Sequence, residues 1–326
     1  MEIVAADLGF GNGKVRDKRG GTIYAAHVSH IGLDFRVEEG GQDDATCMVE
    51  FDNKKFLVGK DAPIKGGKSL SGLDLERIVD GSDEILATTY ATWGNHMLQS
   101  NRRWTEPISL HVGVPASLMI GDAKAANIAS IKTWLCRNHE WSINGSDFRI
   151  KVDNVTVRTQ AAGAISDMAY TLEGKQTRDA QYIESGFAVI SIGYNTVETS
   201  GGIGGMPIGE LITSMQGGVS SMLAIYRTND EFDIPVLEWK LRRNQLNGHL
   251  PTTIDTWSQG IVSHVTTEWK KKINLVQRII LVGGGAQYAE PALRNRFGDK
   301  IWMPDEPIGA IARGLYKRAV YDAKAK

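Results

Sequence analysis

Asp7-Leu8-Gly9-Phe10-Gly11-Asn12-Gly13-Lys14 follows directly on the apolar run from Ile3 to Ala6, and a strand-like pattern resumes from Val15 to Lys18. An apolar strand, a glycine-rich turn and a second strand together form a β-hairpin. This order differs from the strand, glycine loop and helix of a Rossmann or Walker nucleotide site. The start of the chain therefore predicts a glycine-rich hairpin that opens an α/β domain.

A second stretch of the same form lies near the middle of the chain. The apolar run from Phe187 to Ile192 ends at Gly193, and a strand-like pattern follows as far as Thr199. One such hairpin is most often an ordinary β-turn, but two of them with a later Gly283-Gly284-Gly285 turn favour a shared ligand. Two similar hairpins also predict two similar α/β halves.

The spacing of apolar residues predicts the elements between and after these hairpins. Helices are expected over Asp83–Gln99, Ile120–Cys136, Ala161–Leu172, Thr253–Lys272 and Ile308–Lys317, and another after Gly217-Gly218. Strands are expected over Ile108–Val114, Phe148–Val157 and Arg278–Val282, and a loop over Gly32–Asp44. The charged stretch from Asn229 to Asn247 predicts a small peripheral lobe.

Composition excludes several classes of function. The 326 residues include 37 Lys and Arg against 38 Asp and Glu, so the net charge of −1 gives no overall field that attracts DNA or anionic membrane. The two cysteines, Cys47 and Cys136, fit neither a disulfide framework nor a metal-ligand spacing. No apolar run reaches the length of a membrane span. We therefore expect a cytoplasmic protein without direct nucleic-acid or membrane partners.

The glycine-rich turns suit a polyphosphate ligand. Glycine lets backbone amides approach a phosphate closely, and Lys14 adds a positive charge beside them. Asp7 stands at a strand end, where a carboxylate holds a hydrated magnesium ion through water. These residues predict a site for a nucleotide and Mg²⁺.

Six segments, in order along the chain, resemble motifs of the actin-like ATPases of the ParM and archaeal actin-like family. The segments are Asp7–Lys14, Val112–Pro115, Arg158–Ala164, Gly193 with Thr196, Ile280–Ala286 and Ala310–Gly314. The resemblance implies the actin and chaperone-ATPase (ribonuclease-H-like) fold, with two similar α/β domains around a nucleotide cleft. It also implies a first domain of residues 1–182 plus 306–326, and a second of 183–305 with a small lobe at about 225–260.

The same resemblance implies the roles of individual residues. Gln160 orients the attacking water, and Asp7 holds magnesium through water. Ser191 stands where the family normally has a catalytic aspartate, and Glu198 where it has a second one. The implied nucleotide-binding residues are Gly9, Gly11, Asn12, Lys14, Gly193, Tyr194, Asn195, Thr196, Gly217, Gly218, Gly283, Gly284 and Gly285.

Gln160 and one charged run of the chain each have a plain structural alternative to a role in ligand binding. Gln160 is also placed to cap the helix that follows it. Trp239, Lys240, Arg242 and Arg243 could clasp an adenine or an acidic partner, but a short charge run is usually a solvated helix face.

The resemblance implies an ATP-binding protein, with GTP left open, that polymerises into filaments and hydrolyses the nucleotide slowly. The implied role is segregation or positioning of plasmid or phage DNA, with self-association and a DNA-binding adaptor as the partners. Ser191 keeps open a nucleotide-gated scaffold with little hydrolysis, because a serine brings no negative charge to the metal. A small-molecule kinase of the same fold is the other alternative, but it needs a carboxylate base for which we find no candidate.

Overall fold

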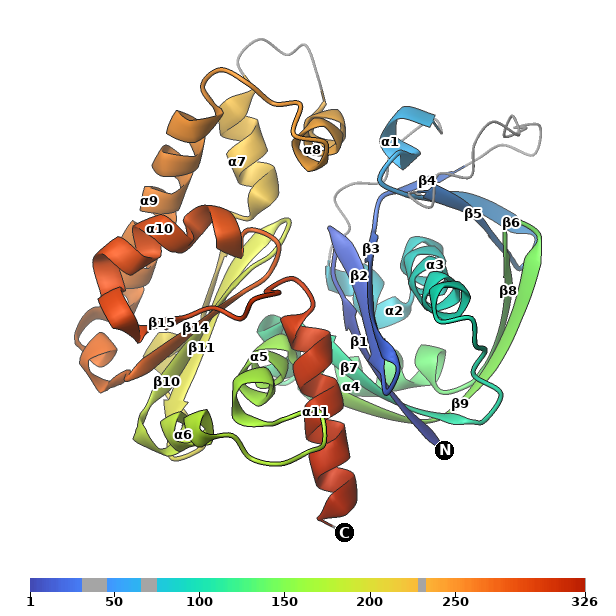
Figure 1. The fold of residues 1–326 in the computed structure, drawn as a ribbon, viewed down its shortest axis with the longest axis horizontal. Coiled ribbons are helices and arrows are strands. Elements are labelled where there is room, and N and C mark those ends of the chain that lie inside the picture. The colour runs from blue at the N-terminus through green and yellow to red at the C-terminus, as the bar shows by residue number, and fades with distance from the viewer. Residues whose placement is uncertain (31–45, 66–74, 228–232, 326) are drawn as a thin grey trace. The chain divides into compact units, whose positions relative to one another are not determined.

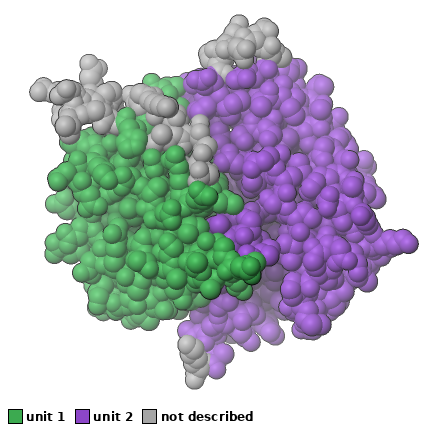
Figure 2. Space-filling model, turned by 180° about the vertical axis from the view of Figure 1, so that it is seen from behind, with its two compact units in different colours: residues 1–112, 121–157 green, residues 113–120, 158–326 purple. Residues whose placement is uncertain are grey.

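The computed structural model describes residues 1–30, 46–65, 75–227 and 233–325. The predicted loop from Gly32 to Asp44 lies outside these ranges. The chain divides into two compact units (Figure 2). Unit 1 comprises Met1–Val112 with Gly121–Val157, and unit 2 comprises Gly113–Ile120 with Arg158–Lys326. None of the described helices is long and apolar enough to cross a membrane.

Unit 1 is built on a sheet with the strand order β3-β2-β1-β7-β9-β8-β5-β6-β4. Its strands are β1 (Glu2–Leu8), β2 (Asn12–Asp17), β3 (Gly20–Ala25), β4 (Val28–His30), β5 (Thr46–Phe51), β6 (Lys54–Gly59), β7 (Ile108–Val114), β8 (Asn138–Ile143) and β9 (Ser146–Thr159). Its helices are α1 (Ala62–Lys65), α2 (Leu75–Asp80), α3 (Asp83–Gln99) and α4 (Lys124–Leu135). The predicted antiparallel hairpin of β1 and β2 is confirmed.

Helix α3 forms the centre of the unit 1 core, lying within the curve of the sheet (Figure 1). Its apolar face is buried, as the spacing of apolar residues predicts. Tyr90 stacks on Trp141 of β8 with ring centroids 4.7 Å apart, and Trp141 stacks on Phe148 of β9 at 5.3 Å. These aromatic contacts fix α3 against the strands that follow it in sequence.

Helix α4 is shorter than predicted. The expected start at Ile120 is wrong because Gly121 has a positive φ of 75°, which interrupts the helix, and Ile120 is exposed. The predicted helix ending at Lys272 instead ends at Trp269, since Lys270 has a φ of 43° and a 3₁₀ turn follows. Both errors lie at helix ends, where apolar spacing carries little information.

Unit 2 has a sheet in the order β12-β11-β10-β14-β15, with β13 also paired to β11. Its strands are β10 (Phe187–Ile192), β11 (Thr196–Ile203), β12 (Met206–Pro207), β13 (Thr213–Gln216), β14 (Arg278–Val282) and β15 (Ile301–Trp302). Its helices are α5 (Gln160–Ala169), α6 (Gln181–Ser185), α7 (Val219–Tyr226), α8 (Ile234–Arg242), α9 (Leu250–Trp269), α10 (Ala286–Phe297) and α11 (Ala310–Lys324). The second predicted hairpin is confirmed, because β10 and β11 pair antiparallel.

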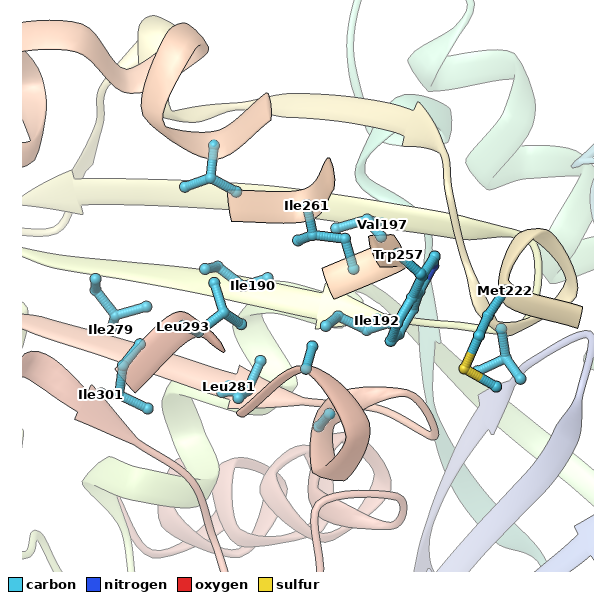
Figure 3. Packing of buried hydrophobic residues seen from close by; sticks show 14 of the residues in the cluster. Ile190, Ile192, Val197, Met222, Trp257, Ile261, Ile279, Leu281, Leu293 and Ile301 are labelled. Atoms are coloured by element: carbon cyan, nitrogen blue, oxygen red, sulfur yellow. The ribbon is translucent and has the colours of Figure 1, made fainter. Parts of the chain in front are cut away.

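The two faces of the unit 2 sheet are covered by different helices (Figure 1). Alternate residues of β10 and β14, such as Ile190 and Leu281, point into a cluster with Trp257 and Ile261 of α9 (Figure 3). The other residues of these strands, including Ser191, therefore face the side on which α5 and α11 pack. This alternation separates the apolar face that packs on α9 from the face that carries Ser191.

Helices α5 and α11 cross where only glycine fits. A Cβ atom on Gly314 would lie 1.8 Å from the carbonyl oxygen of Gly163, and one on Gly163 would lie 2.7 Å from that of Ile311. The buried carboxylate of Asp167 on α5 binds the Arg313 guanidinium of α11 through contacts of 2.8 and 2.6 Å. The predicted close crossing of the last helix is thus confirmed.

The crossing of α5 and α11 determines to which unit the two helices belong. Because α5 packs on β10, β14 and α11, both helices belong to unit 2 by contact. The division implied by the resemblance, residues 1–182 plus 306–326 against 183–305, instead assigns both helices to the first domain. That division stays a prediction.

A buried charge network ties β2 to α3 in unit 1. The Asp17 carboxylate accepts hydrogen bonds from the Arg19 side chain at 2.7 Å and from the Trp104 indole at 3.0 Å, and it lies 3.2 Å from the His96 ring. Burial by itself raises the pKa of Asp17, but the hydrogen bonds from His96, Arg19 and Trp104 outweigh it and hold the pKa well below its usual value. The ionised carboxylate is therefore the stable form in the folded chain.

We expect Gly314→Ala to destabilise the protein by about 1–3 kcal/mol, because the added methyl group overpacks the crossing with Gly163. Gly260→Ala is the matched control: Gly260 is also helical, but a Cβ there meets nothing within 4 Å. Alanine should stabilise α9 by about 0.5–1 kcal/mol. Urea unfolding followed by circular dichroism measures both, and equal effects would contradict the steric argument.

Asp17→Asn should lower stability at neutral pH by about 3–5 kcal/mol, since it leaves the largely buried Arg19 guanidinium without its counter-charge. Because the folded pKa is depressed, the stabilisation by Asp17 is present above its unfolded pKa of about 3.9 and is lost as pH falls towards the lower folded value. Urea unfolding between pH 7 and pH 3 should therefore show a smaller pH slope in the variant. Asp153→Asn, which removes an exposed partner of Lys151, should leave the midpoint nearly unchanged.

Candidate functional site

The first glycine hairpin positions two opposite charges. Asp7 and Lys14 are directly opposed in the β1–β2 register, and the Lys14 Nζ lies 2.9 Å from the Asp7 carboxylate. The Asp7 side chain is fully buried and that of Lys14 is 12% exposed. A carboxylate and an ammonium group therefore stand side by side at the end of β1.

The glycines of this hairpin are required by close packing. A Cβ on Gly9 would lie 2.6 Å from the Lys14 Nζ and 2.7 Å from the carbonyl oxygen of Asn12. A Cβ on Gly13 would lie 2.2 Å from the Thr92 hydroxyl of α3, which itself donates to the Thr88 carbonyl oxygen. The hairpin is thus pressed onto α3, and Thr92 is a contact that the sequence did not reveal.

The second glycine turn, residues 193–196, is held by the start of α7. Backbone amides of residues 217–220 bind the carbonyl oxygens of residues 193–195. These bonds run from Val219 to Gly193 (3.1 Å), from Ser220 to Tyr194 (2.8 Å), and from Gly217 and Gly218 to Asn195 (3.2 and 3.1 Å). Because the carbonyls turn towards α7, the opposite side of the turn presents amides. Within the described ranges, the Asn195 amide donates to no backbone carbonyl.

The third glycine turn, residues 283–285, lies against the end of β10. Gly283 has a positive φ of 100°, and a Cβ there would lie 2.3 Å from the Ile192 carbonyl oxygen. The Gly285 amide donates to that same oxygen at 3.0 Å. Unit 2 therefore brings the turns at 193–196, 217–218 and 283–285 together around one strand end, and Gly284 lies between the two contacting glycines.

Gln160 begins α5, and the structure rejects the alternative that it caps this helix. The cap is Thr159, whose hydroxyl accepts a hydrogen bond from the Ala162 amide at 3.1 Å. A Cβ on Gly113 would lie 3.7 Å from the Gln160 Cγ, so Gln160 lies beside the Gly113–Pro115 segment. The Gln160 side chain is half-buried.

Ser191 and Glu198 are direct cross-strand partners in β10 and β11. Opposed residues project to the same face of a sheet, so Glu198 shares the α5 side with Ser191. The Glu198 carboxylate accepts a hydrogen bond of 3.2 Å from the amide of Ala116, just after Pro115. A carboxylate is therefore retained directly beside Ser191.

The predicted site residues thus fall into two groups. Unit 1 holds Asp7, Gly9, Gly11, Asn12 and Lys14, and unit 2 holds the others. The structure assembles each group within its own unit, and their roles remain predictions.

The donor set fits a hydrated magnesium ion better than a dedicated metal cage. In the part of the chain that the structure describes, no group of three or more His, Cys, Asp and Glu side chains is placed to hold a metal. Magnesium keeps several waters and needs only one or two carboxylates, which Asp7 can supply through water. The glycine turns and Lys14 suit the accompanying polyphosphate.

The charged run on α8 has a structural use that the sequence did not show. Arg242 binds the buried Glu238 carboxylate through its Nε at 3.0 Å, and Arg243 stacks over Trp239 at 4.9 Å from the ring centroid. Burial, followed by the neighbouring Glu238 carboxylate, raises the pKa of Tyr194. The buried position of Glu238 carries no signal in the sequence, because it depends on how α8 packs in the fold.

Comparison with known proteins identifies the same family as the motifs. The sequence model of the N-terminal domain of actin-like proteins matches residues 5–163. Among curated protein sequences, none matches the chain.

Solved structures with the same fold cover almost the whole chain at low identity. The archaeal actin homolog Ta0583 is 18% identical with a TM-score of 0.76, covering 100% of both chains, and its complex with ADP is 16% identical with a TM-score of 0.72 and the same coverage. A 15-stranded ParM filament from Clostridium botulinum is 17% identical with a TM-score of 0.74, covering 98% of this chain and 99% of the other. The apo pSK41 ParM protein is 16% identical with a TM-score of 0.72, covering 100% and 99%.

The sequence model and the solved structures agree on the fold. Residues 5–163 therefore match the N-terminal domain of actin-like proteins, and the chain has the actin-like fold that is shared by ParM and the archaeal actin homolog Ta0583.

Proposed function

We propose that this protein binds ATP with magnesium, polymerises into filaments and hydrolyses the nucleotide slowly. The observation that carries the proposal is the set of glycine turns gathered at the end of β10, where the carbonyls of residues 193–195 are bonded to residues 217–220. The amide side of such a turn suits phosphate oxygens. The ADP complex of Ta0583 and the filament of the botulinum ParM support the nucleotide and the self-association.

Some residues of the site bind the phosphates, and others orient water molecules. Lys14 and the glycine amides neutralise phosphate charge, and Asp7 orients water around the magnesium ion. That ion, which Asp7 would hold through water, would supply positive charge that stabilises the charge developing on the phosphates. Gln160 orients the attacking water but is not a base, so we expect slow turnover.

The proposed cargo is inferred from the net charge of the chain and from the actin-like family. Because the chain is nearly neutral, with a net charge of −1, direct DNA binding is disfavoured. We propose that filaments move or position plasmid or phage DNA in the cytoplasm through a separate DNA-binding adaptor. The adaptor is inferred from the actin-like family and carries no signature in this chain.

A nucleotide-gated scaffold with little hydrolysis is a second candidate, and Ser191 is the observation that favours it. Serine can hydrogen-bond a metal-bound water but contributes no charge. Glu198, opposite Ser191, keeps one carboxylate nearby but also holds the Ala116 amide. The two candidates share nucleotide binding and assembly and differ only in turnover.

Magnesium ATP should cause a rise in light scattering by the purified protein, with filaments visible by negative-stain microscopy. Lys14→Ala should reduce both, because the phosphates lose a positive charge, whereas Lys54→Ala, at an exposed pair with Asp83, should not. If the protein binds nucleotide but forms no filaments, both the filament-forming ATPase and the scaffold with little hydrolysis are refuted. That result would favour a small-molecule kinase or a monomeric switch. Phosphate release measured in the same sample separates the ATPase from the scaffold.

Ser191→Asp should raise phosphate release by about tenfold if the missing charge limits turnover. Like charges directly opposed in a sheet are destabilising, so Ser191→Asp with Glu198→Gln should gain activity without the loss of stability expected of Ser191→Asp alone. Ser185→Asp on the exposed end of α6 is the control for added charge. An unchanged release rate in both Ser191→Asp variants would show that another step is limiting.

A further inference from the structure

The third glycine turn is anchored on both sides of one amide. The Gly283 amide donates to the Pro307 carbonyl oxygen at 3.0 Å. The Gly285 amide donates to the Ile192 carbonyl oxygen, also at 3.0 Å. Within the described ranges, the Gly284 amide between them donates to no backbone carbonyl. Two bound amides therefore set the direction of the amide between them.

An amide held in this way suits an anionic oxygen. A glycine turn lets a ligand oxygen approach the backbone closely. A donor whose direction is fixed before binding also loses no conformational freedom when the acceptor arrives. The Gly284 amide therefore suits a phosphate oxygen, and how well it binds depends on what holds Gly283.

The Pro307 carbonyl belongs to a short segment that leads into α11. Glu306, the residue before it, folds its carboxylate over Gly309 and accepts the Gly309 amide at 2.7 Å. A Cβ on Gly309 would lie 2.5 Å from the Glu306 carboxylate, so only glycine leaves room for this arrangement. Pro304 and Pro307 fix φ at two positions of the same segment. The position of the segment therefore depends on what holds Glu306.

Arg313 of α11 holds Glu306 and also reaches α5. Its Nη1 donates to the Glu306 carboxylate at 2.9 Å, and Nη1 and Nη2 lie 3.4 and 3.3 Å from the Glu306 carbonyl oxygen. Its Nε and Nη2 donate to the buried Asp167 carboxylate of α5 at 2.8 and 2.6 Å. One guanidinium group therefore joins the segment that binds Gly283 to the helix that begins with Gln160.

Neutralisation of Asp167 does not by itself require Arg313. Lys317, about one turn further along α11, already places its Nζ 2.7 Å from the Asp167 carboxylate. A planar guanidinium adds the ability to bind two groups at fixed angles, which an ammonium group lacks. Arg313 is therefore suited to setting the position of the two groups that it joins.

We propose that Arg313 is a positioning residue that, by holding Glu306, fixes the third glycine turn. The turn then presents the Gly284 amide to a phosphate oxygen of the ligand. This inference rests on the proposed nucleotide function and names the atom of the third turn that binds phosphate. Arg313 itself touches no ligand and acts through the Pro307 carbonyl.

The test compares the full-length wild type with Arg313→Met, which keeps a long side chain and removes the guanidinium. Hydrogen exchange at the Gly283 amide, followed by nuclear magnetic resonance without nucleotide, should become about tenfold faster. Exchange at Ile261, in the core on α9, reports opening of the whole unit and should change less. Calorimetry with magnesium should show ADP binding about fivefold weaker, while adenosine binding stays unchanged.

Arg318→Met is the matched control on the same helix. Arg318 pairs with Asp322 at 2.8 Å, and Arg158 stays beside that carboxylate at 2.8 Å when Arg318 is replaced. The control thus removes an arginine from α11 and leaves its acidic partner with one cation, as Arg313→Met does. It should leave exchange at Gly283 and the affinity for ADP as in the wild type.

Glu306→Gln is the second variant, and it cuts the link at its other end. It keeps an oxygen for the Gly309 amide and removes the charge that faces Arg313. The contact between Asp167 and Arg313 stays intact, and the Glu306 side chain is 49% exposed, so this variant should fold normally. Exchange at Gly283 should rise as in Arg313→Met, which secures the test if Arg313→Met folds poorly.

The outcomes separate the inference from the proposed function. Unchanged exchange at Gly283 in Arg313→Met or, where that variant does not fold, in Glu306→Gln would overturn the positioning role. An equal rise at Gly283 and Ile261, or equal weakening of ADP and adenosine binding, would overturn it as well, because either pattern indicates a general structural loss. Faster exchange with unchanged ADP affinity would overturn the phosphate contact of Gly284. If the wild type binds no ADP, the proposed function fails, and the exchange measurement alone decides whether Arg313 holds the turn.

Discussion

Close backbone approach at glycine is the constraint on which both units depend. In unit 1, Gly13 lets the first hairpin lie against Thr92 of α3. In unit 2, Gly314 lets α11 cross α5 at the Gly163 carbonyl, and Gly283 lets the third turn rest on Ile192. A single methyl group at any of these positions meets another residue's atom well inside van der Waals distance, so the turns and crossings exist only because the side chains are absent.

Buried charges are a second feature that organises the fold, and three buried carboxylates are each neutralised within their own unit. Asp17 is held by Arg19 and His96, Asp167 by Arg313, and Glu238 by Arg242. Such pairs give little net stability compared with apolar packing, but losing one partner leaves a costly isolated charge. They therefore act mainly to fix geometry, joining β2 to α3 and α5 to α11, and bracing successive turns of α8.

Close strand packing and a charged side chain occur together at Ser191. The strand register places Glu198 opposite it, and the Ala116 amide orients that carboxylate. A carboxylate therefore lies directly opposite Ser191 and is held in place by the backbone of a segment distant in sequence.

The sequence alone determined the hairpins, the helix and strand periods and the order of the motifs, because these depend on local spacing and on glycine. The resemblance of those motifs to the actin-like family implied the actin-like fold and the candidate residues from Asp7 to Gly285, and the small residues of the last helix predicted its close crossing. Only the tertiary structure decided that Thr159 rather than Gln160 caps α5, that residues 217–220 hold the second turn, and that the Ala116 amide binds the Glu198 carboxylate. Those contacts join residues distant in sequence through packing and strand register, which local periodicity does not encode.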